Sequence, residues 1–376
     1  MKLGIVCDYD EEGWVSMNIC AQMLHDGLLN SNSGIYPAQI RPDFHWRFKY
    51  LNSVIGKHKS FNADRFINRY WEYPRHLRSC RQNYDLFHIA DHSYAHLVHS
   101  LPADRTGVFC HDIDAFRSIF EPELYTGTRS YREISKQILS GMQKAAIVFY
   151  TTNTVRQQIE KYQLVEPTRL VAAPLGVSPE YQIFPILDDP IASELTQKLQ
   201  GKPYIMHVGS CIPRKRIDVL LSVFAQLRDR LPELLLVKVG GEWSQSQRQQ
   251  ITDLNIRENI FHITNVPNQT IAALYQQAAI VMITSELEGF GLPIIEALAC
   301  GSLAIASDIP ALREVGGDAV IYCPVGDIYT WVDRAHRAII TPDFAPILSS
   351  RLRQSALYSW EKHAQSVMAA YLKIAQ

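Results

Sequence analysis

The chain has 376 residues, of which 47% are hydrophobic and 20% are charged, and its formal net charge is −1. This composition is typical of a globular protein, and the length predicts two domains of about 180 residues each. The balanced charge and the lack of a nucleic-acid motif argue against a nucleic-acid partner. Its longest apolar runs fall short of the roughly 20 residues that span a bilayer.

The seven cysteines are scattered and form no Cys-x-x-Cys pair, which favours a reducing compartment and argues against a structural metal site. Because the sequence begins directly with a strand pattern, we expect no signal peptide. The expected location is the cytoplasm, with attachment to the inner face of a membrane as an open alternative.

The first half of the chain alternates short apolar runs with helical patterns. Residues 2–7 form a buried-strand pattern, and Ser16 is placed to cap a helix that runs through Leu28. The intervening loop carries Gly13 at the carboxyl end of a strand, where open α/β sheets bind ligands. Its Asp8-Tyr9-Asp10 has the Asp-x-Asp form of a metal motif, but its place after the first strand favours a capping or acceptor role. Further strands are predicted over 84–92, 106–112, 142–150 and 169–175, with a helix over 155–162.

Residues 41–84 differ in composition from the rest of the chain. They hold ten Lys or Arg against three Asp or Glu, and aromatic residues are interleaved with them. On a helix, four apolar residues would share one face, with two arginines off it. The four are Phe66, Ile67, Tyr70 and Trp71, and the arginines are Arg65 and Arg69. Such an element suits an anionic membrane surface or a phosphate-bearing acceptor. A helix packed on its own domain by these aromatics is an equal alternative.

The second half repeats the strand and helix alternation after a linker. Residues 182–202 contain Pro185, Asp188, Asp189 and Pro190, which indicate a linker followed by a short helix. A basic loop, residues 210–216, follows the first strand of this half. Strands are predicted over 204–209, 234–239, 260–264, 278–283, 303–306 and 319–322, and helices over 217–227, over 270–277 and from 359.

The stretch from Ser285 to Gly301 combines a strand end, a glycine loop and the start of a helix. Pro293 suits the first helical position, where its missing N–H would be unpaired anyway, and Gly301 is placed to end the helix. A free helix N-terminus of this kind binds anions. Glu288 and Glu296 flank it, and ionised carboxylates accept hydrogen bonds from sugar hydroxyls. The stretch therefore indicates a ligand that carries both phosphate and hydroxyl groups.

The sequence EGFGLPIIE, from Glu288 to Glu296, resembles the Glu-x7-Glu signature of the retaining nucleotide-sugar glycosyltransferases of family 4, also called group 1. Residues 297–301 and 307–316 are similar to that family as well. The resemblance implies the type B fold, an α/β architecture of two doubly wound Rossmann-like domains facing a cleft. We expect an acceptor-side domain at 1–180 that also receives the C-terminal helix 357–376, and a nucleotide-sugar domain at 181–356.

The resemblance also implies roles for individual residues. Arg214 and Lys215 would supply cations to the donor diphosphate, whereas Ser210 stands where many members have arginine and Arg216 where glycine or asparagine is common. Glu288 would hold hydroxyls of the sugar. The expected catalytic residues are His111, Arg214, Lys215 and Glu288. The expected donor-binding residues are Gly13, Ser210, Val266, Gly289, Phe290, Gly291, Leu292 and Glu296.

The implied reaction moves a sugar from a nucleotide-diphosphate sugar to a glycan or glycolipid hydroxyl with retained configuration, in polysaccharide or glycoconjugate synthesis. A UDP-sugar is favoured slightly over a GDP-sugar. No metal or other cofactor is expected, because Arg214 and Lys215 carry the needed charge. Two alternatives stay open: a catalytically silent binding subunit, suggested by Ser210 and the sparse first loop, and a nucleotide-sugar epimerase on the same fold. A nicotinamide dehydrogenase is disfavoured, since no Gly-x-Gly-x-x-Gly follows a strand.

Overall fold

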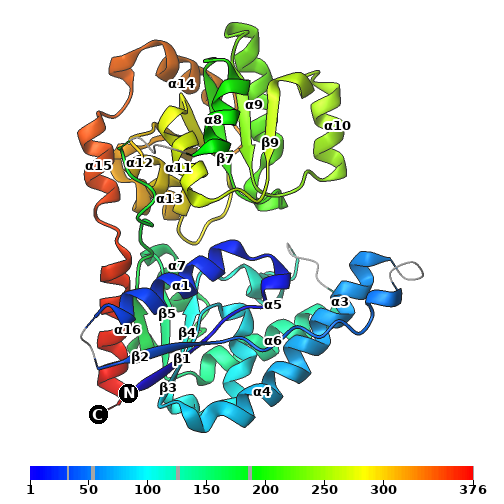
Figure 1. The fold of residues 1–376 in the computed structure, drawn as a ribbon, viewed down its shortest axis with the longest axis vertical. Coiled ribbons are helices and arrows are strands. Elements are labelled where there is room, and N and C mark those ends of the chain that lie inside the picture. The colour runs from blue at the N-terminus through cyan, green and yellow to red at the C-terminus, as the bar shows by residue number, and fades with distance from the viewer. Residues whose placement is uncertain (32–33, 52–55, 124–127, 185–188, 376) are drawn as a thin grey trace. The chain divides into compact units, whose positions relative to one another are not determined.

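The computed structural model describes residues 1–31, 34–51, 56–123, 128–184 and 189–375. The chain divides into two compact domains, shown in Figure 1. The first domain is Met1–Leu175 with Trp360–Gln376, and the second is Gly176–Ser359. Each has a hydrophobic core of its own.

The first domain is built on a parallel sheet whose described strands run in the order β2-β1-β3-β4-β5-β6. The strands are β1 (Lys2–Val6), β2 (Tyr36–Ile40), β3 (Leu86–Ile89), β4 (Thr106–Cys110), β5 (Ile147–Tyr150) and β6 (Leu170–Ala172). The α-helices are α1 (Val15–Leu29), α3 (Lys57–Ile67), α4 (Tyr73–Cys80), α5 (Arg117–Phe120), α6 (Arg129–Lys144), α7 (Asn153–Lys161) and α16 (Trp360–Ile374). A 3-10 helix, η1 (Asp10–Glu12), follows β1, a second, η5 (His92–Ser100), follows β3, and a π-helix, η3 (Asn68–Glu72), joins α3 to α4.

The C-terminal helix α16 packs into the first domain beside α1 (Figure 1). A Cβ on Gly27 of α1 would lie 2.7 Å from the Cβ of Ala364, so the two helices touch where the glycine leaves room. Tyr371 of α16 donates a hydrogen bond to the carbonyl oxygen of Phe87 in β3 at 2.7 Å. The end of the chain is therefore part of the core of this domain.

The second domain holds another parallel sheet, whose described strands run in the order β12-β11-β10-β7-β8-β9. The strands are β7 (Tyr204–Val208), β8 (Leu235–Val239), β9 (Ile260–Ile263), β10 (Ile280–Ile283), β11 (Ala304–Ser307) and β12 (Ile321–Cys323). The α-helices are α8 (Pro190–Leu199), α9 (Ile217–Arg230), α10 (Gln245–Asp253), α11 (Asn268–Gln277), α12 (Leu292–Ala299), α13 (Pro310–Gly316), α14 (Ile328–Ile340) and α15 (Leu348–Ser355). Counted from β7, the order is 3-2-1-4-5-6, the doubly wound arrangement of dinucleotide-binding sheets.

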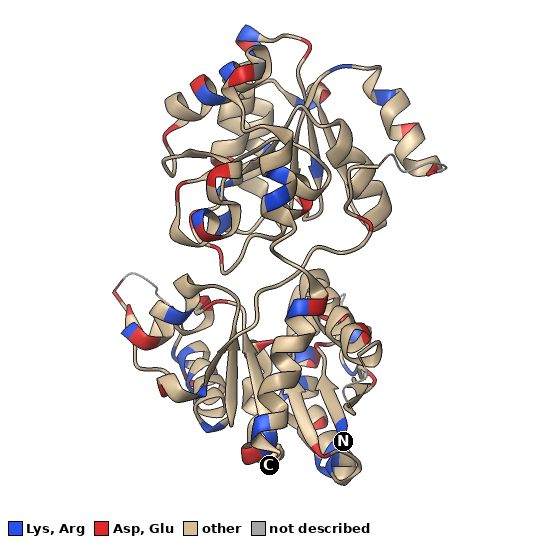
Figure 2. Ribbon diagram, turned by 90° about the vertical axis from the view of Figure 1, so that its left-hand side faces the viewer, with Lys and Arg blue, Asp and Glu red and all other residues tan. Residues whose placement is uncertain are grey.

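The continuous apolar runs of the sequence become strands because parallel strands are covered on both faces. Figure 2 shows charged residues mainly on helices and loops, and the strands largely free of them. Within the described strands, the charged residues are Lys2, at the exposed start of β1, and Lys238, fully buried in β8. The predicted fold class, with two doubly wound α/β halves, is confirmed.

Three local predictions were wrong. Ser16 does not cap α1, which begins at Val15 with Trp14 as its N-cap and no side-chain capping bond. Pro293 occupies the second position of α12, because Leu292 begins that helix. The strand predicted from Met142 begins only at Ile147, because α6 continues through Lys144.

The predicted linker is partly described. Pro185 and Asp188 lie outside the described residues. Asp189 caps α8, since its side chain accepts hydrogen bonds from the N–H groups of Ile191 and Ala192. Among the described residues, no helix is long and apolar enough to cross a membrane.

Candidate active site

In the second domain, the site residues gather at the point where the strand order reverses. The chain proceeds from β7 to β8 and β9 on one side, and β10 then pairs with β7 on the other side. Ligands of open α/β sheets bind outside the carboxyl ends of strands at such a switch point. The loop after β7 (209–216) and the loop after β10 (284–291) leave the sheet there side by side.

Hydrogen bonds join these two loops directly. The N–H of Glu286 donates to the carbonyl oxygen of Arg214 at 2.9 Å, and the hydroxyl of Thr284 donates to that of Lys215 at 2.8 Å. Arg216 has a φ of 48°, in the left-handed region, which explains why small or turn-forming residues suit its position. Its guanidinium bonds Asp218 and Glu286, so it faces acids of its own domain.

Glu288 is the centre of a buried ion cluster. Its Oε1 accepts from Nζ of Lys215 at 2.5 Å and from the Ser285 hydroxyl at 2.7 Å, and its Oε2 accepts from Arg214 at 3.1 Å. Burial alone would raise the pKa of Glu288, but Lys215 and Arg214 lower it to about 2. The cluster therefore holds two cations beside one carboxylate, with a net charge of +1 at neutral pH.

The loop just before α12 carries backbone N–H groups that have no hydrogen-bond acceptor in the described part of the chain. Gly291 precedes the helix with a φ of 105°, a conformation that side chains other than hydrogen rarely allow. Among the described residues, the N–H groups of Phe290 and Gly291 have no acceptor in the protein, and the first turn of any helix has unpaired N–H groups. The result is a set of fixed donors next to Lys215, suited to an anionic ligand.

Glu296 lies one turn further along α12 and is only partly exposed. The hydroxyl of Tyr275 donates to its Oε2 at 3.2 Å. Burial raises the pKa of Glu296 to about 7, and the Tyr275 bond opposes that shift. Its carboxyl therefore changes charge near neutral pH, in contrast to Glu288.

Ser210 and Val266 follow β7 and β9, and both are partly exposed. Within the described part of the chain, no hydrogen bond of the Ser210 side chain tests its predicted role, and the apolar side chain of Val266 can form none.

Lys238 is a residue that the sequence analysis passed over. It is fully buried, and its Nζ donates to the carbonyl oxygens of Gly209 at 2.7 Å, Val239 at 3.0 Å and Gly240. Burial lowers the pKa of Lys238 to about 8, so it carries a positive charge at neutral pH. Through its bond to Gly209, Lys238 holds the first residue of the loop after β7 in place. The signal was present in the sequence, as a lysine inside the apolar run Leu234–Val239.

The first domain carries the two remaining predicted residues, Gly13 and His111. Gly13 has a φ of 71° and open space around the position of a Cβ. His111 follows β4 and is buried; its Nε2 bonds the carbonyl oxygen of Ala90 at 2.8 Å, which places the ring proton on Nε2 and leaves Nδ1 as an acceptor. Burial lowers the pKa of His111, although Asp91 opposes this, so the ring is neutral.

Asp8 and Asp91 form an acid pair at the switch point of the first sheet, after β1 and β3. Asp8 is 2% exposed, and within the described part of the chain no donor reaches either oxygen. Burial and the Asp91 carboxylate raise the pKa of Asp8. Burial would raise the pKa of Asp91 as well, but His92 and Ser93 hold it low. Nδ1 of His92 lies 3.1 Å from the Asp91 carboxylate. Of the two carboxyl groups, that of Asp8 therefore binds a proton more tightly.

Asp10, the second acid of the Asp-x-Asp, has a different environment. It pairs with Arg41 at 2.7 Å and accepts from Asn18 at 2.8 Å, which ties the first loop to α1 and to the residue after β2. The two acids of this motif thus serve separate neighbours.

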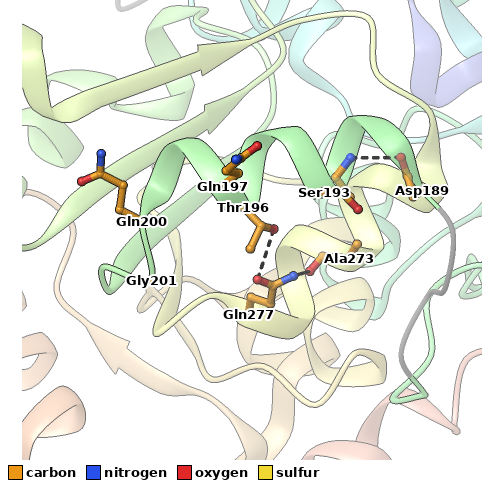
Figure 3. Close-up of a pocket in the computed structure, with 9 residues that line it drawn as sticks. Asp189, Ser193, Thr196, Gln197, Gln200, Gly201, Ala273 and Gln277 are labelled. Carbon is orange, nitrogen blue, oxygen red and sulfur yellow. Dashed lines mark hydrogen bonds between the residues drawn. The ribbon is translucent and has the colours of Figure 1, made fainter.

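A pocket of about 600 Å³ lies elsewhere on the second domain, between α8 and α11 (Figure 3). Its polar side chains bond one another, as Thr196 and Gln277 do at 3.3 Å. None of the predicted site residues lines it. We assign it no role in the site.

Comparison with known proteins agrees with this geometry. The family described as glycosyl transferases group 1 matches residues 190–355, which contain both loops of the switch point. Over these residues the chain is similar to the group 1 glycosyl transferases. Among solved structures, HepE from Anabaena in complex with UDP and glucose superposes with a TM-score of 0.72 over 99% of both chains, at 15% identity. The chain therefore has the two-domain type B fold.

Relatives by sequence include two mannosyltransferases from Escherichia coli. O-antigen chain mannosyltransferase B from Escherichia coli is 28% identical over 313 residues, which are 79% of this chain and 78% of that protein. The serotype-specific mannosyltransferase WbdA from Escherichia coli is 25% identical over 299 residues, 76% of this chain. The match spans only 36% of the length of WbdA.

Proposed function

We propose that this protein transfers a hexose from a nucleotide-diphosphate sugar to a hydroxyl of a glycan or glycolipid acceptor, with retained anomeric configuration. The observation that carries the proposal is the contact of Arg214 and Lys215 with Glu288 near the Phe290 and Gly291 N–H groups that precede α12. It joins a cationic site for a diphosphate to a carboxylate that accepts hydrogen bonds from hydroxyls.

The chemistry demands most from the protein at the leaving group. The bond from sugar C1 to the diphosphate oxygen breaks, and a bond from C1 to the acceptor oxygen forms on the same face. The proton of the acceptor hydroxyl passes to the departing diphosphate. Negative charge grows on the departing diphosphate, and Lys215, Arg214 and the α12 donors stabilise it. A helix dipole contributes about 0.3–1 kcal/mol. One preorganised donor in a dry site contributes about 2.7–4 kcal/mol, so the cations dominate.

Mannose is the sugar we propose, because two relatives are named mannosyltransferases and one acts in O-antigen chains. Polysaccharide assembly is the matching context. For the nucleotide, UDP is supported by the HepE complex only at the level of the fold, so GDP belongs in the same test.

The test is a transfer assay with UDP- and GDP-hexoses and short oligosaccharide acceptors, read by mass spectrometry. The proton spectrum of the product then reports the anomeric configuration. We expect one nucleotide sugar to give product with the donor's configuration. Release of free hexose without acceptor product, or an inverted linkage, would contradict the proposal.

We also propose that transfer needs no divalent metal, since two protein cations already face the diphosphate site. Addition of a chelator should leave the rate unchanged. A rate that falls with chelator and returns with Mg²⁺ or Mn²⁺ would refute this part of the proposal and leave the transfer reaction itself intact.

A further inference from the structure

The first domain has a groove between the π-helix η3 and helix α6, with a volume of about 640 Å³. This lies within the range of about 300–1,000 Å³ for ligand pockets. Three aromatic residues, Phe66, Tyr70 and Trp71, line it, and polar residues stand around them. None of its lining residues is among the predicted catalytic or donor-binding residues.

The π-helix explains why these aromatics are available. The sequence predicted an α-helix on which Phe66, Ile67, Tyr70 and Trp71 share one face, with Arg65 and Arg69 off it. A π-turn inserts one extra residue per turn, and such turns occur frequently at functional sites. Arg69 consequently points inward and is buried, while Phe66 is 52% and Trp71 62% exposed. Two large rings are thus left in solvent by the geometry of the backbone.

Polar contacts beneath the groove hold this backbone in place. The guanidinium of Arg69 lies 3.9 Å from the ring of Tyr94 and bonds the carbonyl oxygen of Ser93 at 2.5 Å. The amide of Asn68 donates to the carbonyl oxygens of Asp64 at 2.8 Å and His45 at 3.0 Å. Because the side chains of Asn68 and Arg69 are both anchored, the backbone that carries the outward-facing residues is held rigid. Binding to these residues therefore costs less conformational entropy.

The rings themselves are also ordered. The Tyr70 ring lies 4.3 Å from the ring of His96 at an angle of 31°, and 5.0 Å from Phe66 at 33°. Aromatic faces carry partial negative charge. They attract the weakly positive C–H groups on the apolar face of a sugar ring, which makes fixed, exposed rings a suitable floor for carbohydrate.

The rim of the groove favours a neutral, hydroxyl-rich ligand over an anionic one. Arg47 is neutralised by Glu72 at 2.6 Å, and α6 adds Gln137 and Glu133, which is paired with Lys136 at 2.8 Å. Carboxylates and an amide accept hydrogen bonds from hydroxyls. Because the lining cation Arg47 is already paired, the lining residues carry no excess positive charge for a phosphate headgroup. The basic composition of residues 41–84 therefore does not make this groove a site for anionic lipid.

We propose that this groove binds neutral sugar units of an oligosaccharide, at positions beyond the one that reacts. The choice of a neutral saccharide rests on the lining of the groove. Its identity as acceptor or product rests on the proposed function. The groove would then give the enzyme a preference for longer chains.

Binding is tested first, without any nucleotide sugar. The probes are linear α-linked oligomers of mannose and of glucose, two to six units long, titrated by calorimetry. Trp71→Ala should weaken binding by about tenfold, since one aromatic contact is removed. Trp71→Phe should restore most of the affinity. Tyr36→Ala, which removes another exposed aromatic of the same domain, is the matched control and should change nothing.

Several results would overturn the groove proposal. One is the absence of binding of every oligomer to the unaltered protein, and another is equal binding by the Trp71→Ala variant. A third is loss of binding to vesicles that contain phosphatidylglycerol in this variant while its oligomer binding stays intact. Because Phe66 and Trp71 are exposed, both alanine variants should fold, and Phe66→Ala repeats the test at a second position.

Kinetics separate this proposal from the proposed function. With a long acceptor, Trp71→Ala should raise KM about tenfold and leave kcat unchanged, while a monosaccharide acceptor should show no change. If oligomers bind but no nucleotide sugar yields transfer, the proposed function fails and the groove stands. If transfer occurs and the variant has normal KM for long acceptors, the groove fails and the function stands.

Discussion

At the residue scale, Lys215 has the most direct predicted effect on the reaction. Its Nζ lies 2.5 Å from Oε1 of Glu288. Lys215 belongs to the loop after β7, beside the loop that leads into α12. Replacing it by alanine removes one charged donor from the leaving diphosphate, and we expect kcat to fall by about 10²–10³. Steady-state kinetics with saturating donor measure this. Lys202→Ala, which removes a surface lysine paired with Glu233, is the control; an unchanged kcat in Lys215→Ala would exclude the role.

Glu288→Gln tests whether the carboxylate acts on the sugar or only holds the cations. Glutamine keeps the shape but removes the charge, so Lys215 and Arg214 lose their counter-charge and remain available to a diphosphate. We expect the free nucleoside diphosphate to bind as well as before or more tightly, while transfer falls by at least about tenfold. Calorimetry with UDP and GDP beside the transfer assay measures both. Equal losses in binding and transfer would contradict the assignment.

Glu296 should make the stability of the second domain depend on pH. Its pKa is raised from 4.5 to about 7, so the folded state binds the proton more strongly than the unfolded state. Its contribution to stability is therefore full below about pH 4.5 and is lost as pH rises to about 7. Glu296→Gln, which can still accept from Tyr275, should match the unaltered protein at pH 4 and have the higher Tm at pH 8. Thermal unfolding of both proteins across this range measures the difference, and an equal Tm at pH 8 would contradict the prediction.

At the element scale, Gly291 sets the direction in which α12 begins. An alanine there would adopt a φ of 105° and bring its Cβ to 2.6 Å from Cδ2 of Leu312. Backbone strain of this kind costs about 1–3 kcal/mol. If the backbone shifts to relieve the strain, the first residues of α12 move away from the ligand. Gly291→Ala should lower both stability and nucleotide affinity. Gly201→Ala has the same kind of strain at a φ of 72° with nothing near its Cβ, so it should lose stability alone. Equal nucleotide affinity in both variants would contradict the role of Gly291.

The elements themselves could largely be predicted from the sequence, because parallel strands are continuous apolar runs and the loops after them carry glycine. Residues 278–283 and the helix after Gly291 illustrate this. The π-turn at Asn68–Glu72 could not be predicted. It depends on the anchoring of Arg69 to Ser93 and Tyr94, which are distant in sequence, and it reverses the expected orientation of the arginine.

Contacts within the candidate site show the same limit. The motif indicated Glu288 and the basic loop separately, but their ion cluster needs β10 to pair with β7. The Asp8 and Asp91 pair likewise needs β3 to lie beside β1. The sequence pattern gives the residue types at the strand ends, and only the strand order brings these residues together. The roles of Glu288, Arg214 and Lys215 in the reaction stay predictions.

At the scale of the whole molecule, two ligands should protect two different parts of the chain. Each domain has its own core, and the proposed nucleotide site and the proposed sugar groove lie in separate domains. A ligand at about 100 times its Kd stabilises the state that binds it by about 2.7 kcal/mol. In hydrogen exchange of the full chain, the nucleoside diphosphate should slow amides of residues 209–216 and 284–296. An α-linked oligomannoside should instead slow those of η3 and the first turns of α6. The α8 and α11 pocket should respond to neither, and protection there by the nucleotide would show that the switch point is the wrong site.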